Sequence, residues 1–240
     1  YPVQFLQNNL YIQNNILHFS YKLKVKKLLF LGSACIYPKY CEQPIIEKAL
    51  MTGALEPTNE AYGIAKIAGI KLAQSYYKQY GMNFFSLMPN NLYGLGDNFD
   101  LETSHVIPAL INKIHYAKIN SLKEVEIWGS GNQLREFLNV QDLADAILFT
   151  MNKINAEDVY NKGISHINIG SGEEVTIRDL ACQIKLITEY AGKLHFNRLK
   201  PDGMPRKLLD NSFLTNYGWK PQISLRKGLE DLYKWYCSNF

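Results

Sequence analysis

Two short apolar runs, each preceded by a longer helical segment, constrain this chain more than any other feature. The runs are K-K-L-L-F-L-G-S, which ends after Gly32, and N-F-F-S-L-M-P-N-N, which Pro89 ends. A continuous apolar run of this kind is typical of a parallel strand that is buried on both faces. Helical periodicity precedes them at 5–20 and 60–80. This order predicts an α/β fold with a doubly wound parallel sheet.

The two helical segments differ in the side chains on their apolar faces. The face of 5–20 carries large apolar residues, namely Phe5, Ile12, Ile16 and Phe19. The face of 60–80 carries mostly small ones, namely Ala61, Ala65, Ala68 and Leu72. Gly81 follows the second segment and is a typical helix stop.

The rest of the chain continues the alternation with shorter elements. Helices are expected at 105–119, at 141–154, after the capping residue Thr176 and from near Ser224. Strands are expected at E-V-E-I-W-G and at S-H-I-N-I-G-S-G, and 197–211 is expected to be irregular. We divide the chain into a nucleotide-cofactor lobe, 1–91 and 139–173, and a smaller α/β substrate lobe, 92–138 and 174–240.

Composition excludes several other classes of protein. A chain of 240 residues with 47% hydrophobic and 20% charged residues is folded rather than disordered. It has no apolar run near the roughly 18 to 20 residues of a membrane span. A net charge of +4 is too small and scattered to indicate a nucleic-acid partner. Four cysteines without a C-x-x-C pair predict no metal site and a reducing, cytoplasmic setting.

Tyr62 and Lys66 give the clearest chemical signal. A spacing of four residues places both on one helix face. A nearby ammonium should lower the pKa of the phenol, so that the pair can exchange a proton with an alcohol oxygen while hydride moves at carbon. Most Y-x-x-x-K pairs are surface pairs, but here Ser33 and Cys35 follow a buried strand at its carboxyl end, where open α/β sheets bind ligands. The plainer alternatives are that Ser33 completes a turn and that Cys35 is a small buried apolar residue.

A series of longer motifs resembles the GDP-L-fucose synthase family, in the extended short-chain dehydrogenase/reductase superfamily. In chain order they are L-G-S-A-C-I-Y-P, E-P-T-N-E-A-Y-G-I-A-K-I-A-G-I-K-L, M-P-N-N-L-Y-G, S-H-V-I-P-A-L, W-G-S-G-N-Q-L-R-E-F-L-N-V and K-P-D-G-M-P-R-K-L-L-D. S-x-C-I-Y-P and S-H-V-I-P-A-L are far more specific than Y-x-x-x-K. Ala34 and Leu95 depart from the usual family residues, and neither departure removes a catalytic group.

The resemblance implies NADPH-dependent 3,5-epimerisation and 4-reduction of GDP-4-keto-6-deoxy-D-mannose to GDP-L-fucose. Ser33, Tyr62 and Lys66 match the family triad. Tyr62 would protonate the C4 oxygen, and Lys66 would also hold the nicotinamide ribose. Cys35 and His105 match the pair that moves protons at C3 and C5.

The resemblance also implies binding residues and an oligomer. The implied contacts to NADP(H) are Leu31, Gly32, Ser33, Ala34, Lys66, Pro89, Asn90, Asn91, Leu92 and His105. The implied substrate contacts are Lys113, Trp128, Arg135 and Lys193, with Asp202 and Arg206 as weaker candidates. A homodimer is implied through 5–20 and 60–80, whose apolar faces a monomer would leave exposed.

One missing pattern leaves alternatives open. The sequence contains neither G-x-G-x-x-G nor G-x-x-G-x-x-G, the turns that bind the cofactor pyrophosphate. We therefore expect that the family's amino-terminal Gly-rich segment is absent and that NADPH is held weakly. The alternatives are a non-catalytic remnant or sugar-nucleotide binding module, and another extended-family epimerase or dehydratase. Cys35 together with His105 argues against the last of these.

Overall fold

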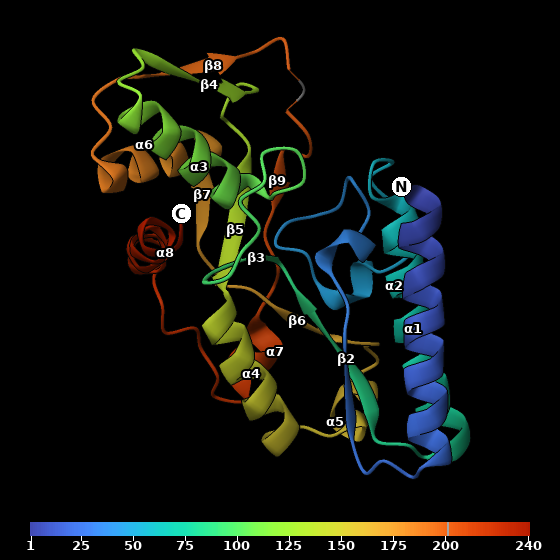
Figure 1. The fold of residues 1–240 in the computed structure, drawn as a ribbon. Helices are drawn as coiled ribbons and strands as arrows, with labels where there is room; N and C mark the ends of the chain where they lie inside the picture. The colour runs from blue at the N-terminus through green and yellow to red at the C-terminus, as the bar shows by residue number, and fades with distance from the viewer. Residues whose placement is uncertain (201) are drawn as a thin grey trace. The chain divides into compact units, whose positions relative to one another are not determined.

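The computed structural model describes residues 1–200 and 202–240, which form two compact units (Figure 1). Unit 1 consists of Tyr1–Asn90, Leu143–Gly172 and Leu209–Lys220. Unit 2 consists of Asn91–Asp142, Glu173–Leu208 and Pro221–Phe240.

The segment Leu209–Lys220 belongs to unit 1, whereas the division expected from the sequence assigned all of 174–240 to the substrate lobe. Leu209 forms a parallel bridge with Ile45. The Trp219 indole donates a hydrogen bond of 2.8 Å to Asp145 Oδ2. These bonds hold the segment in unit 1. Both join residues far apart in the sequence, so no local pattern predicts them.

A three-stranded parallel sheet of order β1-β2-β6 forms the centre of unit 1. Its strands are β1 (Leu28–Leu31), β2 (Phe84–Pro89) and β6 (Ile167–Ile169). β2 is buried along its whole length, as its apolar run predicted. β1 is only half-buried and Leu31 is 38% exposed, whereas β6, at the other edge of the sheet in the described residues, is fully buried. The expectation that β1 is buried on both faces was therefore wrong.

The helices of unit 1 pack on this sheet and on one another. They are α1 (Pro2–Lys22), α2 (Glu60–Tyr80), most of α4 (Val140–Lys153), α5 (Ala156–Tyr160), α7 (Ser212–Asn216) and the short 3-10 turns η1 (Ala34–Ile36) and η2 (Glu47–Ala49). α2 packs against β1 and β2, and α1 runs alongside α2 (Figure 1). Gly81 ends α2 with φ of +66°, as a helix stop should. The predicted parallel α/β architecture, which is Rossmann-like, is confirmed.

The apolar face of α1 does not point into unit 1. Its predicted members, Phe5, Ile12, Ile16 and Phe19, are each 55–65% exposed. The buried residues of α1 are Gln13 and Leu17, and Gln13 Nε2 donates to Ala65 O of α2 at 2.7 Å.

Unit 2 contains a mixed sheet and a separate two-stranded parallel ribbon. The mixed sheet consists of β3 (Asn91–Tyr93), β5 (Leu134–Asn139), β7 (Glu174–Thr176) and β9 (Arg206–Lys207). β5 pairs in parallel with β3 and β9 and antiparallel with β7. The ribbon is β4 (Glu124–Trp128) with β8 (Lys193–Asn197). The expectation that 197–211 is irregular was wrong for β9, which is too short to show a periodic pattern.

Three helices complete the core of unit 2, namely α3 (Val106–Ile119), α6 (Ile177–Thr188) and α8 (Leu225–Asn239). The start of α6 confirms the predicted cap Thr176, and α8 begins after Ser224, near where its start was expected. Thr176 Oγ1 accepts from Asp179 N at 3.0 Å, and Ser224 Oγ accepts from Lys227 N at 3.4 Å. Among the helices of the described residues, none has both the length and the apolar character that crossing a membrane requires.

Candidate active site

The turn after β1 brings the predicted serine and cysteine to the carboxyl end of that strand. Gly32 N donates to Leu87 O at 3.0 Å, and any side chain at Gly32 would collide with Met88. A larger residue at Gly32 would therefore require the end of the Met88 side chain to move. Ser33 then caps η1, and its Oγ accepts from Cys35 N at 3.3 Å. Both side chains are half-buried.

Helix α2 brings a phenol and an ammonium to the same end of β1. Lys66 Nζ lies 5.6 Å from the centroid of the Tyr62 ring and donates to Leu31 O at 3.1 Å. The Ser33 side chain lies close enough to Tyr62 to lower the pKa of its phenol. The structure thus groups Ser33, Tyr62 and Lys66, as the sequence predicted, and Cys35 lies two residues beyond Ser33 on the same turn.

Gly63 is the residue that lets α2 approach this turn. A Cβ at Gly63 would lie 2.8 Å from Cys35 O and 3.0 Å from Leu55 Cδ1. A glycine inside a helix costs about 1 kcal/mol relative to alanine, so its position next to Tyr62 was an available signal of close packing. Sequence reasoning did not use it.

The pKa of Tyr62 does not move in the direction expected from the sequence. Burial raises it most, the nearby Cys35 raises it further, and the Ser33 side chain lowers it. Burial also lowers the pKa of Lys66. The expected lowering by Lys66 was wrong, because desolvation of the phenolate dominates and the ammonium is directed at Leu31 O. Tyr62 is therefore protonated at neutral pH, a form suited to donating a proton.

The neighbouring strands supply further predicted cofactor residues in unit 1. Pro89 ends β2, and Asn90 N donates to Ile169 O at the end of β6 at 3.1 Å. The carboxyl ends of parallel strands form the edge at which open α/β sheets bind nucleotides. The donor set at this edge, a hydroxyl, a phenol and an ammonium with three protons, fits the ribose hydroxyls and amide of a nicotinamide nucleotide.

Unit 2 holds the remaining predicted cofactor residues. Asn91 and Leu92 lie on β3, and the Asn91 side chain donates to Glu136 O of β5 at 2.9 Å, so its amide also holds the sheet together. His105 is exposed at the start of α3. Burial raises the pKa of Asp97, and the nearby His105 lowers it.

The predicted substrate residue Trp128 lies on the surface of unit 2. Its side chain is 59% exposed. Lys113 Nζ lies 5.2 Å from its ring centroid, and Lys200 Nζ lies 5.0 Å from it. Two ammonium groups beside one indole suit a ligand that combines an aromatic base with negative charge. Sequence reasoning missed Lys200, which has no motif of its own.

Arg135 and the loop after β8 form a second polar group in unit 2. Arg135 is half-buried, Nη1 donates to Leu134 O at 2.8 Å, and burial lowers the pKa of the guanidinium. Asp202 accepts from the backbone N and the hydroxyl of Ser130 at 2.6 and 2.9 Å. Arg206 forms two bonds of 2.7 and 2.6 Å with Glu174, which gives it a structural role in the sheet.

Lys193 is not grouped with the other predicted substrate residues. It begins β8 and pairs with Glu124, whereas Trp128 pairs with Asn197 at the other end of the ribbon. Four residues of strand separate the two positions, which is about 13 Å. The parallel register, which the sequence does not reveal, sets this separation.

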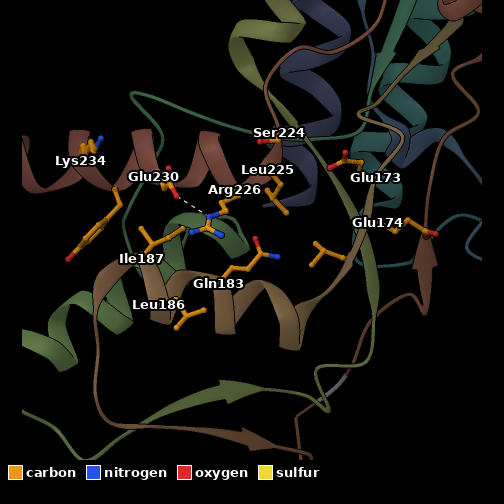
Figure 2. Close-up of a pocket in the computed structure, with 12 residues that line it drawn as sticks. Glu173, Glu174, Gln183, Leu186, Ile187, Ser224, Leu225, Arg226, Glu230 and Lys234 are labelled. Atoms are coloured by element: carbon orange, nitrogen blue, oxygen red, sulfur yellow. Dashed lines mark hydrogen bonds and ion pairs between the residues drawn. The ribbon is translucent and has the colours of Figure 1, made fainter.

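A separate groove of about 790 Å³ lies between β7, α6 and α8 of unit 2 (Figure 2). Leu186, Ile187 and Leu225 contribute apolar surface, and charged side chains such as Glu173, Arg226 and Glu230 surround it. In the described part of the chain, no predicted site residue lines it.

Known proteins resemble the chain over its whole length. Residues 1–170 match the NAD dependent epimerase/dehydratase family. The chain is 54% identical over 239 residues to GDP-L-fucose synthase 1 of Arabidopsis thaliana, covering 100% of this chain and 72% of that protein.

Two solved structures match the fold closely. A GDP-6-OMe-4-keto-L-xylo-heptose reductase from C. jejuni has a TM-score of 0.94 and 38% identity, over 100% of this chain and 78% of that one. A GDP-L-fucose synthetase from Naegleria fowleri, bound to NADP, has a TM-score of 0.90 and 30% identity, over 99% of this chain and 74% of that one.

Proposed function

We propose that this chain, which belongs to the GDP-L-fucose synthase family, converts GDP-4-keto-6-deoxy-D-mannose to GDP-L-fucose. The reaction combines 3,5-epimerisation with NADPH-dependent 4-reduction. The observation that carries the proposal is the group of Ser33, Tyr62 and Lys66 at the end of β1, with Cys35 on the same turn.

NADPH, when bound, supplies the hydride for C4. We assign its contacts to Leu31, Gly32, Ser33, Ala34, Lys66, Pro89, Asn90, Asn91, Leu92 and His105. The Leu31 carbonyl takes one of the three protons of the Lys66 ammonium, and we assign the ribose hydroxyls to the others.

Tyr62 donates the proton of the reduction. Its pKa is raised, so the phenol carries its proton at neutral pH and can give it to the C4 oxygen as that oxygen gains charge. The Ser33 hydroxyl, which lies near Tyr62, contacts the same oxygen and orients the ketone.

Cys35 and His105 carry out the epimerisation. The protons on C3 and C5 are acidic because the C4 ketone accepts the charge as an enolate. We assign the removal of a proton to Cys35 as the base and the return of a proton to His105 as the acid, and return to the other face inverts the carbon. Solvent then restores both groups.

The GDP part of the substrate calls for positive and aromatic side chains. We assign it to Lys113, Trp128 and Arg135, and leave out Lys193, which lies at the other end of the ribbon. Arg135 suits the diphosphate because a guanidinium can bind it through two parallel hydrogen bonds.

A two-part assay tests the proposed function. The chain is incubated in D₂O with GDP-4-keto-6-deoxy-D-mannose and NADP⁺, and NMR follows deuterium entry at C3 and C5. NADPH is then added, and the product is identified. We expect exchange at both carbons and formation of GDP-L-fucose, and Cys35→Ser should abolish the exchange. A reduced product that keeps the original configuration at C3 and C5 would contradict the epimerase role.

We also propose a cytoplasmic homodimer. All four cysteines are thiols, as in proteins of a reducing compartment. The apolar face of α1 is exposed, and a second copy of the chain would cover it. Light scattering should give twice the chain mass, and Ile12→Glu should give a monomer. Asn14→Glu, on another exposed face of α1, is the control, and a monomeric wild type would contradict the proposal.

A further inference from the structure

A buried chain of polar side chains lies next to the turn that carries Cys35. The Tyr37 hydroxyl donates to Asn168 Oδ1 and lies 2.6 Å from His166 Nε2. Asn168 Nδ2 donates to Ile45 O at 2.8 Å, and Ser165 Oγ lies 3.0 Å from His166 Nδ1. Tyr37 is 2% exposed, and His166 and Asn168 are fully buried.

These hydrogen bonds determine which atom is the donor and which the acceptor in each contact between the buried polar side chains. The Asn168 amide donates to Ile45 O, so its oxygen accepts from the Tyr37 hydroxyl. The Tyr37 oxygen then accepts from His166 Nε2–H, and His166 Nδ1 accepts from the Ser165 hydroxyl. Burial and nearby Lys71 lower the pKa of His166 to about 3, and burial raises that of Tyr37 well above its usual value. The side chains therefore keep one protonation state at neutral pH and serve to hold structure.

What they hold is the catalytic turn. Tyr37 directly follows η1, and its backbone N donates to Ala34 O at 3.4 Å. Cys35 is therefore two residues from a side chain anchored to β6, and its carbonyl lies against Gly63 of α2. Both contacts fix the backbone from which Ser33 and Cys35 project.

We propose that Tyr37 is a positioning residue for proton transfer at the sugar. Its hydroxyl anchors the Ser33–Cys35 turn to Asn168 of β6 and to His166, which directly precedes β6. The inference rests on the proposed function. Proton transfer at carbon depends on the placement of the base to within a fraction of an ångström. Loss of the anchor should therefore slow the chemical step and leave substrate affinity unchanged.

The test compares Tyr37→Phe with Tyr160→Phe. The Tyr160 hydroxyl also serves unit 1, donating to Phe84 O at 2.9 Å, but it does not touch the turn. Both variants remove one internal tyrosine hydroxyl, which makes two hydrogen bonds at Tyr37 and one at Tyr160, so Tyr160→Phe controls for the loss of an internal hydroxyl and urea unfolding of both variants measures the remaining difference in stability. We expect Tyr37→Phe to lower the rate of deuterium exchange at C3 and C5 by about 10- to 100-fold, with KM within about twofold. Tyr160→Phe should keep the wild-type rate.

A second readout follows the turn without substrate. Iodoacetamide alkylation of Cys35 is measured by mass spectrometry against the exposed Cys182 and Cys237. Tyr37→Phe should change the alkylation rate of Cys35 relative to these references, and Tyr160→Phe should not. If the wild type exchanges no deuterium, the proposed function fails, and the alkylation readout still decides whether Tyr37 anchors the turn.

A double variant tests whether Tyr37 acts through Asn168. If both residues belong to one anchor, Tyr37→Phe with Asn168→Ala should lose no more exchange rate than the worse single variant. Should Tyr37→Phe fail to fold by circular dichroism, Asn168→Ala alone carries the same expectation. The proposal is overturned if the variants keep the wild-type exchange rate and Cys35 alkylation, or if Tyr160→Phe loses as much of either.

Discussion

The two units of this protein hold their chemistry-bearing side chains in different ways. In unit 1, Cys35 rests against Gly63, and the Lys66 ammonium is bonded to a strand carbonyl. In unit 2, Trp128 is mostly exposed, and two lysine ammonium groups lie near its ring. Proton transfer needs a fixed geometry, whereas attraction to a charged ligand tolerates mobile side chains. Apart from the proposed acid His105, which belongs to unit 2, the difference indicates that unit 1 supplies placement and unit 2 supplies charge.

The largest expected effect comes from removing the phenol of unit 1. Tyr62→Phe removes the group that donates a proton to the C4 oxygen, so we expect turnover in NADPH oxidation to fall by about 10²- to 10⁴-fold. Deuterium exchange at C3 and C5 should persist, because Cys35 is unchanged. Tyr80→Phe, at the end of the same helix, is the matched control. Normal NADPH oxidation by Tyr62→Phe would mean that Tyr62 does not donate the proton of the reduction, and unit 1 would lose its assigned catalytic acid.

Much of this site could be predicted from the sequence because its signals are local. The spacing of Tyr62 and Lys66 placed them on one helix face, and the apolar run before Ser33 placed that residue at a strand end. The direction of the Tyr62 pKa shift could not be predicted, since it depends on how deeply the phenol is buried. A one-dimensional pattern does not contain that depth.

The anchor of the turn was invisible in the sequence for a different reason. Tyr37 and Asn168 are separated by 131 positions, and S-H-I-N-I indicates only a strand. The separation of Lys193 from Trp128 likewise follows from a register between distant strands. Local periodicity predicts elements well, but it does not say which polar side chains meet.

The next effect tests whether unit 2 contributes affinity rather than rate. Arg135→Met removes a guanidinium assigned to the diphosphate, and a hydrogen bond to a charged group contributes about 1.5–3 kcal/mol. We expect KM for the GDP-sugar to rise by about 10- to 100-fold while kcat changes little. Arg226→Met, at the groove of Figure 2, is the control. A fall in kcat at unchanged KM would show that Arg135 also positions the reacting sugar.

Acidification tests the buried side chains of unit 1. His166 has a pKa of about 3 in the folded protein, below its unfolded value of about 6.5, so the unfolded state binds more protons between these values. Stability should therefore fall as pH drops through this window, by about 1.4 kcal/mol per pH unit and about 2 kcal/mol at pH 5. Burial also raises the pKa of Glu47, so just above the ordinary carboxyl range the folded state binds more protons at this group than the unfolded state does. In that range the protonation of Glu47 therefore opposes the loss of stability caused by His166.

Urea unfolding at pH 7 and pH 5 measures the effect of His166. His166→Gln keeps a neutral donor for Tyr37 and an acceptor for Ser165, so it should unfold with a weaker dependence on pH than the wild type. Equal pH dependence in the two proteins would mean that His166 does not provide the acid sensitivity of unit 1.

The smallest effect is expected at the rim of the groove in unit 2. Arg226 Nε and Glu230 Oε1 are 3.1 Å apart on α8 (Figure 2), and the Arg226 side chain is 81% exposed. Water and salt screen such a pair, so Glu230→Gln should lower the free energy of unfolding by only about 0.3–0.5 kcal/mol. Raising the salt concentration to about 1 M should abolish most of that difference, because the Debye length then shrinks to about 3 Å. Urea unfolding at low and high salt measures both the loss of stability in Glu230→Gln and its dependence on salt. Tyr160→Phe is the buried reference in unit 1. A salt-independent loss above about 1 kcal/mol would mean that this surface is held as firmly as the interior of unit 1, and the contrast between the units would then fail.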